Sequence, residues 1–86
     1  MPTICIFFGI VIRMYFDDHE PAHFHAVYGE YQAIISIDTL EILRGKLPRR
    51  ALELVLDWAE LHQAELRENW KLARSDTELK NIAPLE

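Results

Sequence analysis

The chain has 86 residues, of which 50% are hydrophobic and 27% charged, and its formal net charge is −5 at pH 7. This length and composition indicate one globular domain spanning residues 1–86 and exclude a largely disordered chain. The negative net charge disfavours a protein that binds nucleic acid over its whole surface, because such binding relies on clustered Lys and Arg.

The N-terminal residues combine one cysteine with an apolar run. Cys5 is the only cysteine, so no internal disulfide can form, and its isoleucine neighbours indicate a buried, unreactive thiol. The run over residues 4–12 has no preceding Lys or Arg and no cleavage site, and Arg13 ends it short of a membrane span. We therefore expect a cytoplasmic protein with neither a signal peptide nor a membrane segment.

Three or four antiparallel strands are predicted in the first half of the chain. Residues 9–17 alternate apolar and polar β-forming side chains, and residues 24–28 and 31–37 form two further alternating runs. Gly29-Glu30 joins these two runs, and Gly at the first loop position favours a type II′ hairpin turn. Residues 38–40 are typical of a turn, and residues 41–44 predict a short fourth strand.

The hairpin turn fixes a strand register. The expected pairs are Tyr28 with Tyr31, Ala26 with Ala33, Phe24 with Ile35, His25 with Ile34 and His23 with Ser36. The Phe24, Ala26 and Ile35 side chains then share one apolar face, and both histidines lie on the other.

Pro48 predicts the start of a helical half, since no Gly or Pro follows until after residue 74. Its apolar stripe, which must pack on the sheet, contains Ala51, Leu52, Val55, Trp58, Ala59, Leu66 and Trp70. A continuous helix of about 40 Å would overhang an eight-residue strand of about 26 Å. We therefore expect either a break within residues 62–65 or an overhang used for dimerisation.

The predicted fold is thus α+β: an antiparallel three- or four-stranded meander followed by one long or two shorter helices packed on one face. Residues 75–78 have capping-box spacing and predict a short final helix. Residues 82–85 are expected to pack back at one edge.

Residues 17–25 concentrate three of the four histidines and three acids. His23 and His25, two apart on a strand, would point to the same side about 7 Å apart, so both rings could reach one metal ion. A third ligand could come from His19, Asp17 or Asp38. Zn²⁺ would suit this nitrogen-rich set and could activate a water.

A structural role for the cluster is the alternative. His23 and His25 would then donate to Asp17, Asp18 or backbone carbonyls and organise the proline-containing turn. His62 lies within the apolar stripe, and it joins the cluster only if the helix covers the histidine face. Since the face of Phe24 is the more hydrophobic, we expect a core or interface role for His62.

Four cations, Arg44, Lys46, Arg49 and Arg50, fall within seven residues around the predicted helix start. The free N–H groups and the positive end of the helix dipole point to the same place, which favours a phosphate or carboxylate. The alternatives are an anion or RNA contact and a solvated basic patch.

Several strings carry a family resemblance: Pro2-Thr3-Ile4, Gly9-Ile10, residues 12–15, Asp18-His19, residues 23–26, residues 45–50, Trp58 and residues 65–70. Over nearly the whole chain they resemble the bacterial family called domain of unknown function 4160. A common family form has a second proline where this chain has Ala22. The resemblance implies no established activity. It does imply a genomic habit, since members are often encoded beside a second small protein of another uncharacterised family, in pairs similar to toxin–antitoxin modules.

The usual signatures of hydrolases, nucleotide enzymes and zinc proteases are absent from the sequence. We expect a protein-interaction module, one partner of a two-protein system, whose sheet face with Val11, Val27 and Ile34 is buried by a homodimer or heterodimer partner. The alternatives are a metal-dependent hydrolase or nuclease using His19, His23 and His25, and an anion or RNA binder using residues 44–50.

Overall fold

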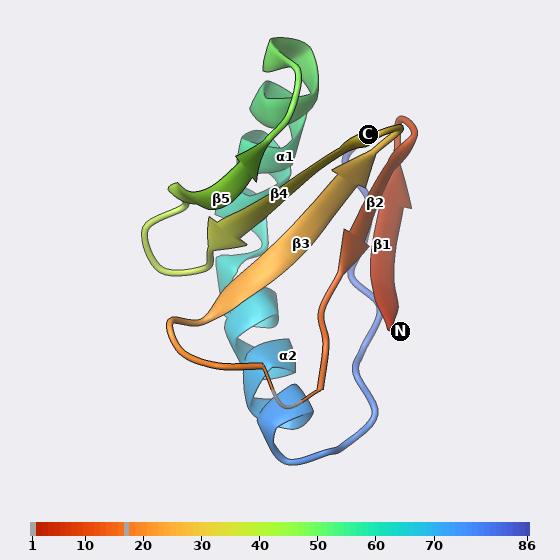
Figure 1. Cartoon of the computed structure of the whole chain (residues 1–86). Helices are drawn as coiled ribbons and strands as arrows, with labels where there is room; N and C mark the ends of the chain where they lie inside the picture. The colour runs from red at the N-terminus through yellow and green to blue at the C-terminus, as the bar shows by residue number, and fades with distance from the viewer. Residues whose placement is uncertain (1, 17) are drawn as a thin grey trace.

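Short β-forming runs separated by tight turns fold the first half of the chain into one sheet. The computed structural model describes residues 2–16 and 18–86, which form five antiparallel strands followed by two helices (Figure 1). The strands pair in chain order: β1 (Thr3–Phe7), β2 (Ile10–Arg13), β3 (His23–Tyr28), β4 (Tyr31–Ser36) and β5 (Ile42–Lys46). Helices α1 (Arg49–Leu61) and α2 (Gln63–Arg74) lie behind the sheet in Figure 1, so that view shows the uncovered face.

The α+β fold class and the meander are confirmed, but the prediction of three or four strands misses β1. Ile4 and Cys5 are both buried, because the pairing of β1 with β2 is irregular between Thr3 and Cys5. Such a bulge interrupts the period of two on which strand prediction depends. β2 is also shorter than predicted, since it ends at Arg13, and Asp17 lies outside the described residues.

The predicted register of the β3–β4 hairpin is confirmed at all five pairs. Gly29 has a φ of +59°, as the first loop position of a type II′ turn requires. Phe24 and Ile35 are therefore fully buried beneath the helices, while His23 and His25 point to the opposite face.

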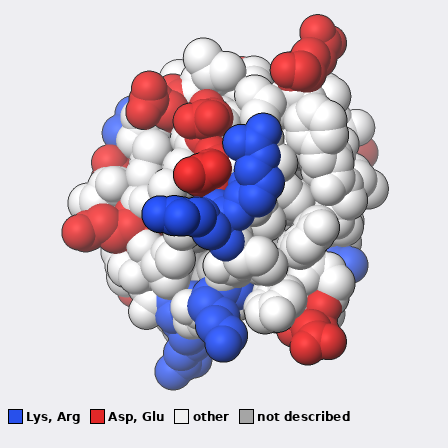
Figure 2. Space-filling view, turned by 90° about the horizontal axis from the view of Figure 1, so that it is seen from above, with Lys and Arg blue, Asp and Glu red and all other residues white. Residues whose placement is uncertain are grey.

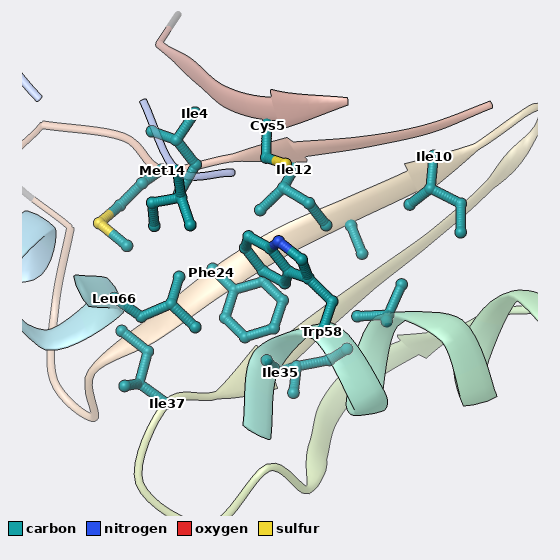
Figure 3. Packing of buried hydrophobic residues seen from close by; sticks show 14 of the residues in the cluster. Ile4, Cys5, Ile10, Ile12, Met14, Phe24, Ile35, Ile37, Trp58 and Leu66 are labelled. Carbon is teal, nitrogen blue, oxygen red and sulfur yellow. The ribbon is translucent and has the colours of Figure 1, made fainter. Parts of the chain in front are cut away.

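The core lies between the sheet and α1, with Trp58 at its centre (Figure 3). The Trp58 ring packs against Phe24 and Phe7, with ring centroids 6.0 Å and 5.5 Å away. Its indole N–H donates to the carbonyl of Ala83 at 2.8 Å. Trp58 and Trp70 are both buried within the chain, so they leave no large apolar area for a partner.

The helical half is broken at His62, which is one of the two predicted alternatives. After the break, the Gln63 amide donates to the carbonyls of Ile37 and Asp38 at 2.7 Å and 3.1 Å. Arg67 pairs with the Asp38 carboxylate at 3.0 Å. The break therefore lets the start of α2 bind the turn after β4.

The prediction of a short final helix starting at residues 75–78 is wrong, because those residues terminate α2 instead. Asp76 adopts a φ of +56°, and its N–H donates to the Ala73 carbonyl at 3.2 Å. The Thr77 N–H donates to the Leu72 carbonyl at 2.9 Å. These two bonds form a Schellman motif, which satisfies the last carbonyls of a helix.

The remaining C-terminal residues return to the β1 edge, as predicted for residues 82–85. Buried Asn69 exchanges two hydrogen bonds with the backbone of Lys80, at 2.8 Å and 2.9 Å. The Ile82 N–H then donates to the Ile4 carbonyl at 2.9 Å. The tail therefore covers part of the outer edge of β1.

No helix within residues 2–16 and 18–86 is long and apolar enough to cross a membrane.

Two glycines allow a test of how β5 is held. Gly45 has a φ of +81° and lies where a Cβ would collide with the Gln32 carbonyl, whereas Gly29 has positive φ but open space. We expect Gly29→Ala to cost about 1–2 kcal/mol for backbone strain alone. Gly45→Ala should cost more, because the collision also displaces β5 from β4. Urea unfolding of both variants measures this, and equal losses would contradict the observed packing of β5.

Candidate functional site on the open sheet face

The strand register defines the sheet face that the helices leave uncovered, here called the open face. Directly paired residues of antiparallel strands share a face. One row across the open face holds Ile6, Val11, Val27, Gln32 and Lys46, and the next holds Arg13, His25, Ile34 and Arg44. His23 and Ser36 form a third row. The open face thus combines an apolar middle, basic side chains at its sides and two histidines at one end.

His23 is held in one orientation by the turn that precedes β3. Its Nδ1 lies 2.7 Å from the Pro21 carbonyl oxygen, and its ring lies 5.2 Å from that of Trp70, between centroids. A carbonyl oxygen only accepts hydrogen bonds, so Nδ1 must carry a hydrogen. The other ring nitrogen, Nε2, points at Asp18 Oδ2 from 3.1 Å.

His25 points at the same carboxylate. Its Nε2 lies 3.4 Å from Asp18 Oδ2, and its Nδ1 lies 3.2 Å from the side-chain amide nitrogen of Gln32. The Tyr15 ring covers it edge-on at 4.4 Å, and the residue is only 9% exposed. Burial lowers the pKa of His25, and the nearby His23 adds to this, while the hydrogen bond and charge of Asp18 act in the opposite direction.

Asp18, His23 and His25 therefore form one cluster, here called the HHD cluster. Each contributes one potential ligand atom, and these atoms all lie within 4.8 Å of one another. Asp18 and His23 also line an open groove of about 490 Å³, together with Ile34, Leu43 and Arg44. The cluster is thus partly buried yet adjoins a surface depression.

The structure brings together only part of the predicted metal set. Asp18, which the sequence reasoning treated only as a hydrogen-bond acceptor, stands beside the two strand histidines. His19 is exposed and lines the groove outside the cluster, and Asp38 pairs with Arg67 instead. The only sequence signal for Asp18 was its place in the acidic run before β3, which does not distinguish it from Asp17, a residue outside the described part.

His62 lies apart from the HHD cluster, as expected from the burial of the Phe24 face. Its Nδ1 shares a hydrogen bond with Glu65 Oε1 at 2.6 Å, and its ring lies 5.6 Å from that of Trp58. This hydrogen bond satisfies the Nδ1 atom of His62 at the helix break.

The four predicted anion-binding cations divide into two pairs. Arg44 and Lys46 lie on the open face, opposite Ile34 and Gln32, whereas Arg49 and Arg50 begin α1. Arg50 also lies 3.5 Å from Glu53. Figure 2, which looks down on the end where α1 begins, shows basic side chains in separate groups with acidic ones beside them. This surface is mixed in charge.

A family model described as a domain of unknown function, DUF4160, matches residues 9–71. The chain belongs to this family. The matched residues include β2 to β5, α1, most of α2 and the whole HHD cluster, whereas β1 and the tail that pairs with it lie outside. The other comparisons found no match among curated proteins and none among solved structures.

The environment of His25 predicts its protonation. We expect its folded-state pKa to lie below the ordinary 6.5, because burial removes water from the charged form. As the pH falls, His25 then takes up a proton in the unfolded chain before it does so in the folded chain. The free energy of unfolding therefore decreases as the pH falls from 6.5 towards the folded-state pKa of His25. An NMR titration of the His25 ring protons measures this directly, and a midpoint at or above 6.5 would contradict the burial.

Proposed function

We propose that this protein is a small interaction module whose open face binds the second protein of a two-protein system. The supporting observation is the apolar middle of a sheet face that no described helix covers. Ile6 and Leu43 are 60% and 46% exposed, and Val11, Val27 and Ile34 are half-buried. An antiparallel sheet that faces water normally alternates to polar side chains on that side. Clustered apolar side chains there are typical of a binding surface.

The charge of the open face indicates what kind of partner fits it. Arg13, Arg44 and Lys46 flank the apolar middle, although the chain as a whole is acidic. Interfaces commonly pair an apolar centre with a rim of complementary charge. We therefore expect the partner surface to be apolar at its centre and acidic around it.

The edges of the sheet are less suited to binding than its face. The tail bonds to the outer edge of β1 through Ile82 and Ile4. Within the described residues no strand pairs with the outer edge of β5, but that strand carries two cations and an irregular pairing beside Ile34. Charges and bulges on edge strands discourage the addition of another strand.

The gene neighbourhood that the family resemblance implies identifies the partner to test, namely the small protein encoded beside this one. A pairing of the toxin–antitoxin type is the system we propose. We also propose a cytoplasmic location, which the unpaired, buried Cys5 supports because disulfides characterise oxidising compartments.

RNA binding is the less favoured function. Arg49 and Arg50 lie at the start of α1 and Arg44 and Lys46 on the open face, so the four cations do not line one track. Acidic side chains also accompany the basic ones in Figure 2. Phosphate-dominated binding needs cations that neutralise successive phosphates together.

Val27→Asp tests the proposal, because it places a charge at the middle of the open face, in the row next to that of His25. We expect affinity for the neighbouring gene product to fall at least tenfold, about 1.4 kcal/mol or more, since the carboxylate would be buried without a partner. Leu61→Asp is the matched control, because Leu61 is 70% exposed and belongs to α1. Titration calorimetry with the purified neighbour measures both variants.

Melting curves check that each variant is folded, since a strand substitution alone alters stability by about 1 kcal/mol. Light scattering across a concentration series reports whether the partner is a second copy instead. A protein that stays monomeric and ignores its neighbour, or a Val27→Asp variant that binds as well as the Leu61→Asp control, would overturn the proposal. Salt-sensitive binding of RNA with no protein partner would favour the alternative.

A further inference from the structure

The HHD cluster has an imbalance of hydrogen-bond donors and acceptors. The Pro21 carbonyl fixes the hydrogen of neutral His23 on Nδ1, so Nε2 presents a lone pair. That lone pair faces Asp18 Oδ2 from 3.1 Å, and a carboxylate oxygen also only accepts. Two acceptors at this separation repel one another unless a positive charge lies between them. A proton on His23 or a metal ion can supply that charge.

His25 completes the set of atoms that a metal ion could bind. Its Nε2 approaches the same oxygen, Asp18 Oδ2, from 3.4 Å, and all three potential ligand atoms lie within 4.8 Å of one another. A proton on His23 bridges one of these pairs, whereas a metal ion can bind all three atoms at once. In tetrahedral zinc sites with bonds near 2.0–2.1 Å, neighbouring ligand atoms are about 3.3 Å apart. The observed 3.1 Å and 3.4 Å are close to that separation.

The supports around the ligand atoms are those of a metal site. Metal-binding histidines usually donate their other ring N–H to a carbonyl or carboxylate, which fixes the ring orientation. Pro21 does this for His23. Gln32 is placed to do the same for His25, since its side-chain amide lies 3.2 Å from Nδ1 and can present its oxygen after a half-turn.

We infer that Asp18, His23 and His25 bind one divalent transition-metal ion such as Zn²⁺, a role separate from partner binding. Two imidazoles and one carboxylate are a common ligand set for Zn²⁺ and Fe²⁺. Three protein ligands leave a coordination position for water or an anion. The adjoining groove, lined by Asp18, His23 and the cation Arg44, would give an anionic ligand access to that position.

The site differs from the one that the sequence predicted, because Asp18 replaces His19. His19 therefore provides the matched control for the experiment. Asp18→Asn is the informative variant, since it removes the charge at constant shape and its side chain is 29% exposed. Substitution of the buried histidines would instead risk the fold of the sheet.

The experiment is calorimetric titration of the metal-stripped full chain with Zn²⁺ alone. We expect one ion per chain with sub-micromolar affinity, an affinity at least about tenfold weaker for Asp18→Asn, and no change for His19→Ala. Because no partner protein is present, failure here leaves the proposed function untouched. Melting curves of both variants, recorded without metal, confirm that each is folded.

Co²⁺ provides a second measurement on the unaltered protein. Its visible absorption reports coordination geometry, and NMR would show perturbation confined to the region of His23 and His25. Four-coordinate Co²⁺ with these shifts supports the site. Absence of Zn²⁺ binding, equal binding by Asp18→Asn, or loss on His19→Ala would each overturn it, leaving the proton on His23 as the charge that holds the cluster.

Discussion

The register of the β3–β4 hairpin is the constraint on which both faces of the sheet depend. Side chains alternate along a strand, so a slip of one residue would turn His23 and His25 into the core and expose Phe24. The Phe24 ring packs against buried Trp58, which strongly disfavours that slip. The same alternation that builds the core therefore also delivers two imidazoles to one end of the open face.

The length of the helical half has a local use that sequence reasoning did not anticipate. α2 extends beyond the sheet, and its residues Trp70 and Arg74 donate to the Glu20 carboxylate at 3.2 Å and 3.1 Å. Glu20 belongs to the loop that carries Asp18 and Pro21. We expected this overhang, if present, to form a dimer. Within one chain it instead braces the loop that orients His23 and points Asp18 towards the His23 ring.

The parts predicted correctly are those set by contacts close in sequence. The hairpin register follows from Gly29 and the alternation around it, and the helix break falls at His62 within the predicted residues. β1 was missed because its bulge disrupts the alternation. A final helix was wrongly predicted from residues 75–78, because polar residues suited to an N-cap also suit a Schellman motif.

The candidate site could not be predicted fully, because it depends on contacts that the loop conformation and the tertiary fold create. The carboxylate that meets the histidines is chosen by how the loop before β3 runs, and no local pattern separates Asp18 from its neighbours. Arg44 and Arg49 are close in sequence but lie on a strand and a helix that packs on the opposite sheet face. Charge clustering along a sequence therefore does not imply clustering in space.

The metal site depends on His23 carrying a hydrogen on Nδ1, so that its Nε2 is the ring nitrogen turned towards Asp18. Nitrogen-15 NMR of the imidazole rings tests this most directly, because the two ring nitrogens have distinct shifts in each tautomer. In metal-free protein at mildly alkaline pH, we predict a hydrogen on Nδ1 of His23 and the Nε2–H form for His25. A His23 ring with its only hydrogen on Nε2 would contradict the account, because Nδ1 could then not donate to Pro21.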